Sequence, residues 1–507
     1  MKSGVVYLVG AGPGDAGLMT MRGAELLARA DVVVYDALVN AELLKLAPKE
    51  AEVIYGGKRS KDHAIPQDEL NSLLVKKAKE GKVVVRLKGG DPYTFGRGGE
   101  EAEELGAAGV RFEVVPGVSS ISAAPNYAGI PITHRSHCSS FTVITGHEDP
   151  NKPESSVDWA HVAKDRGTKV ILMGMERIAE IARLLISYGM EPETPVGMVR
   201  WGTTGKQTSI QGTLSNIAKV IQEKNFGAPA VTVIGDVVNL RKKLNWFENR
   251  PLFGQRIVVT RTREQASQLA QQLSEMGAEI LEIPTIRIEP PAEKDGLKDA
   301  ILGLHGYDWV VFTSPNGVTT FFEYYFKAFD DLRDIGGVKI AAVGPATAAK
   351  VKELHLKVDV MPEEYVSARV AKALSDFEDI ENLRILLMRA EVANRELPKE
   401  LEAMGAIVDD VASYRTVMET EDRNGAAARL LELGADWITF TSSSTVENFH
   451  ARFNLPELVK RFARLRLASI GPETTKTIKA LGLEPAFEAK PHNIAGLVNG
   501  LCGPRRE

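Results

Sequence analysis

The segment that decides the fold of the first half is Arg86-Leu-Lys-Gly-Gly-Asp-Pro-Tyr-Thr-Phe-Gly-Arg-Gly-Gly-Glu-Glu101. It continues the apolar run 83–87, which is typical of a buried strand, and it opens the helical pattern of 98–108. Its glycines let the backbone approach a ligand closely. Asp91 can accept hydrogen bonds from a hydroxyl or an amine, and Arg97 offers a two-pronged donor to a carboxylate. The segment therefore predicts a ligand-binding loop between a strand and a helix.

The same alternation of short β-branched runs and helical patterns extends along the chain. The runs typical of buried strands are 5–9, 32–35, 83–87, 143–145, 170–173 and 231–234. The stretches typical of amphipathic helices include 67–80, 98–108 and 214–224. This alternation predicts an α/β architecture with largely parallel sheets.

Length and composition exclude several classes of protein. The 507 residues predict about three to four domains, and 44% hydrophobic with 25% charged residues is typical of folded, soluble chains. A net charge of −5 argues against a nucleic-acid coat. Cys138 and Cys502 are too few for a disulfide framework or a four-cysteine metal site, so we expect a reducing cytosol and no metal centre. The sequence has no apolar run of about 18 residues and no secretory signal, so we expect no membrane association.

The second half of the chain repeats itself after a charged, aromatic and Pro/Gly-containing break near 240–255. The segment 308–314 matches 436–442, an offset of 128 residues from Trp309 to Trp437. Two further pairs lie at nearly the same offset, 276–280 with 404–408 and 343–347 with 470–474. A period this long predicts two similar α/β lobes, and a cleft between lobes is a favoured ligand site. A duplication that serves folding alone is the alternative.

A glycine loop at 9–15 follows the first predicted strand and resembles a dinucleotide-binding fingerprint. That fingerprint needs a third glycine where this chain has Asp15. A carboxylate there would crowd the helix–strand contact and repel a pyrophosphate. An oxidoreductase that binds nicotinamide or flavin is therefore a rival interpretation, to be tested by cofactor binding.

Seven motifs in one order resemble uroporphyrinogen-III C-methyltransferases over residues 1–248. They are GAGPGD (10–15), VVYD (33–36), GGK (56–58), the segment 86–101, PGVSS (116–120), GIPITHR (129–135) and PAVTVIGDVV (229–238). The resemblance implies a tetrapyrrole-methylase fold of two α/β domains, about 1–115 and 116–245, within a methyltransferase unit of 1–245. It also implies S-adenosylmethionine in the cleft between the domains, and a homodimer.

The resemblance also assigns residues. Those expected to line the S-adenosylmethionine site are Pro13, Gly89, Gly90, Asp91, Thr94, Ser119, Ser120, Met173, Gly202, Ala230 and Thr232. Asp36 and Lys58 match the family's proton-transfer positions, and Arg97, Glu100 and Arg135 match positions associated with substrate. Because free arginine stays charged, we prefer Arg97 as a carboxylate anchor, with Asp36 or Glu100 as the proton carrier. Ser119-Ser120 and Arg200-Trp201 depart from the family's common residues.

Serine and threonine residues at predicted helix starts mark the second half, for example 312–317 and 440–444. Hydroxyls and free amides there bind anions, although ordinary helix capping explains each site equally well. Together with 343–347, 470–474 and 412–416, these motifs resemble uroporphyrinogen-III synthases over about 254–503. The resemblance implies a bilobed α/β fold, with a linker at 246–253, one lobe of 254–285 plus 417–503, and another of 290–411.

Within this half, the resemblance makes Tyr414 a proton donor to the departing hydroxyl, and a packed hinge aromatic is the equal alternative. The expected substrate contacts are Ser314, Thr347, Arg389, Thr441, Ser442 and Thr474, with Arg395 as a further family match. No cofactor is implied for the synthase half.

The two resemblances together imply a bifunctional enzyme of tetrapyrrole biosynthesis. The second half would cyclise hydroxymethylbilane to uroporphyrinogen III, and the first would methylate it twice to precorrin-2. The rival for the second half is a bilobed module that binds a bilane without converting it. The sequence leaves open whether the product serves sirohaem, cobalamin or haem d1.

Overall fold

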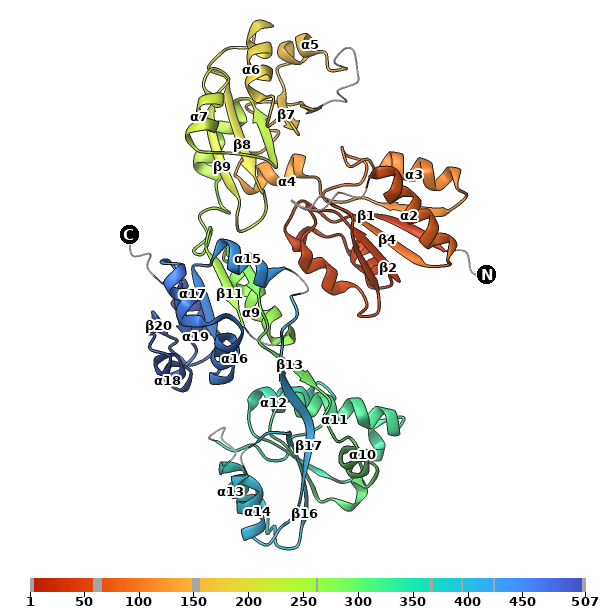
Figure 1. The fold of residues 1–507 in the computed structure, drawn as a ribbon, viewed down its shortest axis with the longest axis vertical. Helices are drawn as coiled ribbons and strands as arrows, with labels where there is room; N and C mark the ends of the chain where they lie inside the picture. Colours follow the sequence, from red (N-terminus) through yellow and green to blue (C-terminus); the bar gives the residue numbers. More distant parts are fainter. Residues whose placement is uncertain are drawn as a thin grey trace.

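The computed structural model describes residues 4–57, 66–147, 156–260, 263–363, 368–393, 395–422 and 425–503, with the backbone alone for 263–267 and 368. In these ranges the chain builds four five-stranded sheets, two in each half (Figure 1). Within the described ranges, no helix has the length and apolar character needed to cross a membrane.

The first sheet has the order β3-β2-β4-β1-β5 and is parallel throughout. Its strands are β1 (Val5–Gly10), β2 (Val32–Tyr35), β3 (Glu52–Tyr55), β4 (Val83–Lys88) and β5 (Arg111–Val115). Helices α2 (Gln67–Lys79) and α3 (Gly98–Ala107) cover one face, while α1 (Met21–Leu27) and the short helix Ala41–Leu46 cover the other. Burial on both faces explains why the inner strands β1, β2 and β4 are rich in valine, whereas the edge strands β3 and β5 are partly exposed.

The second sheet corrects the expectation of largely parallel sheets. Its order is β6-β7-β10-β8-β9, and only the β6–β7 pair is parallel. The strands are β6 (Phe141–Thr145), β7 (Thr168–Leu172), β8 (Pro195–Arg200), β9 (Thr208–Thr213) and β10 (Ala230–Ile234). Helices α4 (Ser120–Tyr127), α5 (Trp159–Lys164), α6 (Ile178–Ser187) and α7 (Ile217–Glu223) pack on it. A buried apolar run is the same in either strand direction, so the sequence pattern did not reveal the antiparallel pairs.

The third and fourth sheets belong to the repeated half. The third has the order β12-β11-β18-β19-β20 and is parallel, and the fourth has the order β13-β17-β16-β14-β15, with only β13–β17 antiparallel. Their strands are β11 (Arg256–Val259), β12 (Glu279–Glu282), β13 (Ile286–Glu289), β14 (Trp309–Phe312), β15 (Lys339–Ala342), β16 (Arg384–Ala390), β17 (Ile407–Met418), β18 (Trp437–Phe440), β19 (Arg466–Ser469) and β20 (Phe487–Glu488). Strands β13 and β17 connect the two lobes (Figure 1).

The repeat in the sequence corresponds to a shared strand order. Strands β12-β11-β18-β19 of one lobe correspond to β17-β16-β14-β15 of the other. Arg256 begins β11 and Arg384 begins β16, at the same 128-residue offset that separates Trp309 from Trp437. Helices surround both sheets: α9 (Arg263–Glu275), α10 (Asp295–Leu302), α11 (Pro315–Ala328), α12 (Pro345–Lys352), α13 (Ala368–Phe377), α14 (Glu396–Ala403), α15 (Ala426–Leu433), α16 (Ser443–Phe453), α17 (Leu455–Arg461), α18 (Pro472–Ala480) and α19 (Ile494–Leu501).

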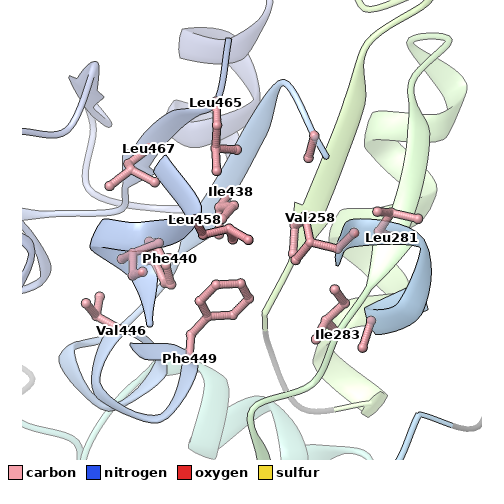
Figure 2. Packing of buried hydrophobic residues seen from close by; sticks show 14 of the residues in the cluster. Val258, Leu281, Ile283, Ile438, Phe440, Val446, Phe449, Leu458, Leu465 and Leu467 are labelled. Carbon is pink, nitrogen blue, oxygen red and sulfur yellow. The ribbon is translucent and has the colours of Figure 1, made fainter. Parts of the chain in front are cut away.

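Alternating residues of each parallel strand fill cores on opposite faces of the sheet. In β11, Val258 joins Ile438 and Phe440 in the core beneath α15, α16 and α17 (Figure 2). Its neighbours Ile257 and Val259 join the core beneath α9 and α19 instead. Because both faces are covered, each lobe is a three-layer α/β/α unit.

The segment joining the two halves is packed rather than free. Trp246 donates a hydrogen bond from Nε1 to the Asn126 carbonyl at 3.2 Å, and its ring contacts Tyr127. Phe247 and Leu252 are 3% and 0% exposed. The short helix α8 (Arg241–Leu244) precedes this segment. The aromatic residues of the segment between the two halves therefore anchor that segment on α4.

Candidate functional sites

Glycine-rich loops meet at the carboxyl ends of β1 and β4. A Cβ on Gly10 would lie 2.5 Å from the Cα of Gly117, and one on Gly117 would lie 2.2 Å from the Gly90 carbonyl oxygen. The chain leaves β1 and β4 toward opposite faces of the sheet, so this is a topological switch point. A topological switch point is the usual place of the ligand site in an open α/β sheet.

The Asp91 carboxylate joins the loops at this switch point. Its Oδ2 accepts a hydrogen bond from the Gly117 amide at 3.0 Å. Its Oδ1 accepts bonds from the Tyr93 amide and the Thr94 hydroxyl, both at 3.0 Å. Gly90 has a φ of +71°, and a Cβ on it would lie 3.9 Å from the Ser120 amide nitrogen. The structure thus brings together six of the residues expected to line the S-adenosylmethionine site: Gly89, Gly90, Asp91, Thr94, Ser119 and Ser120.

A second group of predicted cofactor residues comes from the other domain of the first half. Ala230 pairs with Arg200, and the Trp201 amide donates to the Pro229 carbonyl at 3.3 Å. Met173 directly follows β7, has a φ of +53° and is half exposed. The expected strand 170–173 therefore ends one residue early. Thr232 is 1% exposed and lies within the sheet core.

The two groups meet through Asp15. The Asp15 amide donates to Thr203 Oγ1 at 3.0 Å, and Tyr127 donates its hydroxyl proton to Asp15 Oδ2 at 2.8 Å. A Cβ on Gly14 would lie 3.3 Å from the Gly202 carbonyl oxygen, so the loop bearing Pro13 abuts the loop bearing Gly202. Burial, with the bond to Asp15, raises the pKa of Tyr127 above its usual value. Asp15 occupies the position where a dinucleotide-binding fingerprint needs a glycine. Its carboxylate instead contacts the other domain of the first half through Tyr127.

Asp36 and Arg97 each form an ion pair. The pair of Asp36 is partly buried, and the pair of Arg97 is exposed. Arg86 donates from Nη2 to Asp36 Oδ1 at 2.5 Å, and the Asp36 side chain is 31% exposed. Arg97 forms a bidentate pair with Glu100, with Nη2 to Oε2 at 2.6 Å and Nε to Oε1 at 3.0 Å. This pairing holds the pKa of Glu100 below its usual range. The Arg97 guanidinium, which we expect to bind a substrate carboxylate, is paired with Glu100 in this structure.

The structure describes one of the two further predicted residues of this half. Arg135 is exposed on a turn closed by the His134–Cys138 bridge. Lys58 lies outside the described residues.

Sequence reasoning missed three charged residues beneath this site. Arg86, Lys88 and Glu101 are 2%, 2% and 0% exposed and form one ionic cluster. A signal was present, because Arg86 and Lys88 alternate with valine and leucine in β4 and so lie on one covered face.

In the second half, the predicted Tyr414 and Ser314 lie together. Their hydroxyl oxygens are 3.0 Å apart, and Ser314 also caps α11 by accepting from the Gly317 amide at 3.1 Å. Tyr414 is 8% exposed. The Ser413 hydroxyl donates to the Arg389 carbonyl at 2.8 Å, which ties β17 to the end of β16.

The other predicted substrate contacts of this half lie near the ends of strands and the starts of helices. Arg389 is 6% exposed and donates from Nε to Asp410 Oδ1 at 2.8 Å. Ser442 caps α16 in a capping box with Thr445, which is the ordinary reading of that motif. Thr347 and Thr474 are buried in the first turns of α12 and α18, whereas Thr441 is partly exposed. Arg395 precedes α14. Within the described ranges, no hydrogen bond joins Thr441, Ser442 or Thr474 to the Ser314–Tyr414 pair.

Known proteins match both halves. Residues 5–218 match the family model of tetrapyrrole (corrin/porphyrin) methylases, and residues 267–499 match that of uroporphyrinogen-III synthase HemD. The porphyrin biosynthesis protein HemD of Ruminiclostridium josui is 39% identical over 484 residues, 95% of each chain. The chain belongs to this family of methylase–synthase fusions.

Relatives of the methylase half alone are also close. The S-adenosyl-L-methionine-dependent uroporphyrinogen III methyltransferase of Methanosarcina barkeri is 53% identical over 237 residues, which is 47% of this fusion chain and 93% of the relative. The uroporphyrin III C-methyl transferase structure from Thermus thermophilus is 39% identical, with 46% and 99% of the two chains covered and a TM-score of 0.40.

Proposed function

We propose that the fusion cyclises hydroxymethylbilane to uroporphyrinogen III in its second half and methylates that product twice, to precorrin-2, in its first. The observation that carries the proposal is the order of the two matched families on one chain, shared with a relative across 95% of both lengths. The strand-end loops around Asp91 in the first half and the paired hydroxyls in the second are consistent with this chemistry.

The switch point of the first half suits S-adenosylmethionine. The close approach of Gly10, Gly90 and Gly117 leaves no room for side chains, and Asp91 suits an amine or a ribose hydroxyl. The M. barkeri relative is named for dependence on this molecule. Residues proposed to hold it are Pro13, Gly89, Gly90, Asp91, Thr94, Ser119, Ser120, Met173, Gly202, Ala230 and Thr232. When bound, it supplies a methyl group activated by a sulfonium.

We assign substrate binding and proton transfer in the first half to its charged side chains. Arg97 and Arg135 would anchor substrate carboxylates, each hydrogen bond contributing about 1.5–3 kcal/mol. Arg97 would exchange Glu100 for a substrate carboxylate as it does so. Asp36 would accept the proton that the macrocycle releases after methylation, with Lys58 as the partner in proton transfer. Alignment of the reactants can contribute about 7–11 kcal/mol.

The second half needs geometry and acid assistance but no cofactor. Tyr414 would protonate the departing hydroxyl of hydroxymethylbilane, and Ser314 orients the phenol. Proposed substrate contacts are Ser314, Thr347, Arg389, Thr441, Ser442 and Thr474. A cation then forms at the terminal methylene, and ring closure with inversion of the last ring gives isomer III.

We assign a methyltransferase unit of 1–245 with domains of about 1–115 and 116–245, a connection at 246–253, and a synthase unit of 254–503. Its lobes are 254–285 plus 417–503, and 290–411. A homodimer through the first half and a reducing cytosol complete the proposal, and both cysteines are free thiols.

The test is anaerobic incubation of the pure protein with hydroxymethylbilane, with and without S-adenosylmethionine. We expect isomer III without the methyl donor and a gain of two methyl groups with it, read by mass and isomer ratio after oxidation. Isomer I alone would overturn the synthase assignment. Isomer III that stays unmethylated would overturn the methyltransferase assignment.

A further inference from the structure

A buried ionic cluster lies on the face of the first sheet that α2 and α3 cover. It consists of Arg86 and Lys88 from β4 and Glu101 from the first turn of α3, each with a side chain at most 3% exposed. Lys88 directly precedes the Gly89–Asp91 loop that lines the proposed cofactor site. The cluster is therefore directly connected to the loop that we propose binds the methyl donor.

Glu101 is the centre of the cluster. Its Oε1 accepts hydrogen bonds from Lys88 Nζ at 2.7 Å, Arg86 Nε at 3.1 Å and Gln67 Nε2 at 3.2 Å. Its Oε2 is buried and has no hydrogen-bond partner within the described part of the chain. One carboxylate oxygen thus fixes two cations at once.

The cluster reaches the site through Arg86. Its guanidinium donates from Nε to Glu101, from Nη1 to the Val34 carbonyl at 3.5 Å, and from Nη2 to Asp36 Oδ1 at 2.5 Å. All three nitrogens are engaged, so the direction of the Nη2 bond is set by the other two. The Asp36 carboxylate is held at the end of β2 by a donor that Glu101 anchors.

Stability does not account for this arrangement. Burying charged groups carries a desolvation cost, and well-packed apolar residues often serve a core as well or better. Burial lowers the pKa of Lys88 despite its contact with Glu101, which shows that cost. Titratable groups with perturbed pKa values are enriched at functional sites. The same stretch places Glu100 outward against Arg97 and Glu101 inward against Arg86, so two adjacent glutamates have separate roles.

We propose that Glu101 is a positioning residue for methyl transfer, which acts by anchoring Arg86 and thereby fixing the orientation of the Asp36 carboxylate. The inference rests on the proposed methyltransferase function. The pyrrole carbon takes the methyl group as the S–CH3 bond breaks with its electron pair going to sulfur. Arg86 holds Oδ1 of Asp36, and Oδ2 takes a proton from another position of the cationic macrocycle, whose bonding electron pair stays in the macrocycle and neutralises it.

The test is Glu101→Gln in the full chain. We expect the kcat of methyl transfer to fall about 10- to 100-fold, because a small misplacement of a reacting group has that effect. The KM for uroporphyrinogen III and the calorimetric Kd for S-adenosylmethionine should stay within about 3-fold of wild type, since Arg97 and Asp91 are untouched. Glu103→Gln, exposed on the same helix, is the matched control and should leave all three unchanged. A wild-type kcat in Glu101→Gln overturns the proposal.

A charge-balanced double variant separates positioning from folding. Lys88→Gln with Glu101→Gln removes one charge of each sign, so the Tm should recover toward wild type while kcat stays low. Recovery of kcat together with Tm would show a purely structural role and overturn the inference. If Glu101→Gln does not fold, the double variant alone decides. Failure of the wild-type protein to methylate uroporphyrinogen III would overturn the proposed function instead, and cyclisation by the second half controls for protein quality.

Discussion

The hydroxyl oxygens of Ser314 and Tyr414 lie 3.0 Å apart, although 100 residues separate them in the chain. Ser314 caps α11, and Tyr414 lies on β17, the strand that connects the two lobes. The serine has two tasks, since it accepts from the Gly317 amide and shares a hydrogen bond with the phenol. A helix cap thereby orients the proposed proton donor.

We predict that Tyr414→Phe slows cyclisation by about 100-fold without abolishing it, because loss of general acid assistance has at least that effect while geometry remains. The measurement is the initial rate of isomer III formation from hydroxymethylbilane. An unchanged rate would remove Tyr414 from the mechanism.

Ser314→Ala should slow the same reaction about 5-fold, the loss of one hydrogen bond of about 1 kcal/mol. It should also destabilise the chain by about 1 kcal/mol through the lost cap. Asn493→Ala is the control, because Asn493 caps α19 in the same way, at 2.9 Å from the Gly496 amide. That variant should match the stability loss and leave cyclisation unchanged, and equal slowing in both would contradict the specific role of Ser314.

Asp91→Asn should weaken S-adenosylmethionine binding by about 10-fold or more. The change keeps the size of the side chain but replaces one acceptor oxygen with a donor, so one of the bonds from Gly117, Tyr93 and Thr94 is lost. Isothermal calorimetry gives the Kd, and the cyclisation rate of the second half should be unaffected. An unchanged Kd would place the cofactor elsewhere.

Gly202→Val should reduce both S-adenosylmethionine affinity and the stability of the first half. A Cβ at this position would lie 2.4 Å from the Cβ of Ala124 on α4, so the loop or the helix must shift. Gly106→Ala, in α3 where the nearest atom is 3.9 Å away, is the matched control and should be neutral or stabilising by up to about 1 kcal/mol. Cofactor binding and thermal unfolding measure the two effects.

Tyr307 should make the stability of its lobe depend on alkaline pH. Burial and a 2.6 Å hydrogen bond to Asp409 raise the pKa of Tyr307 to about 12. The folded state therefore holds this proton more tightly than the unfolded state, where the pKa is about 10. The contribution is complete below pH 10 and is lost as pH rises toward 12. Urea unfolding at pH 9 and 11 should show a smaller decline for Tyr307→Phe than for wild type, and equal declines would contradict the assignment.

Local features of the fold could be predicted well from the sequence. The valine-rich runs gave strands within a few residues, because burial on both faces of a sheet requires apolar residues at every position. The 128-residue offset indicated two lobes, and the structure shows the shared strand order behind it. The glycine loop at 86–101 was placed correctly between β4 and α3, since strand, turn and helix signals are all local.

Other features required the tertiary structure. A buried run has the same composition in either direction, so the antiparallel pairs of β10 with β7 and β8 were missed. The sequence does not show which of Glu100 and Glu101 is buried, and only the packing of α3 on β4 buries Glu101 and exposes Glu100.

The sequence by itself determined which chemical groups this chain carries and in what order: the glycine loops, the helix caps, the duplicated lobes and the two family resemblances. The tertiary structure decided which of those groups meet. Asp15 with Tyr127, Arg86 with Asp36 and Ser314 with Tyr414 are joined across 50 to 112 residues. The physical reason is that propensity and capping depend on neighbours in the chain, whereas hydrogen bonds between distant segments depend on how whole sheets and helices pack.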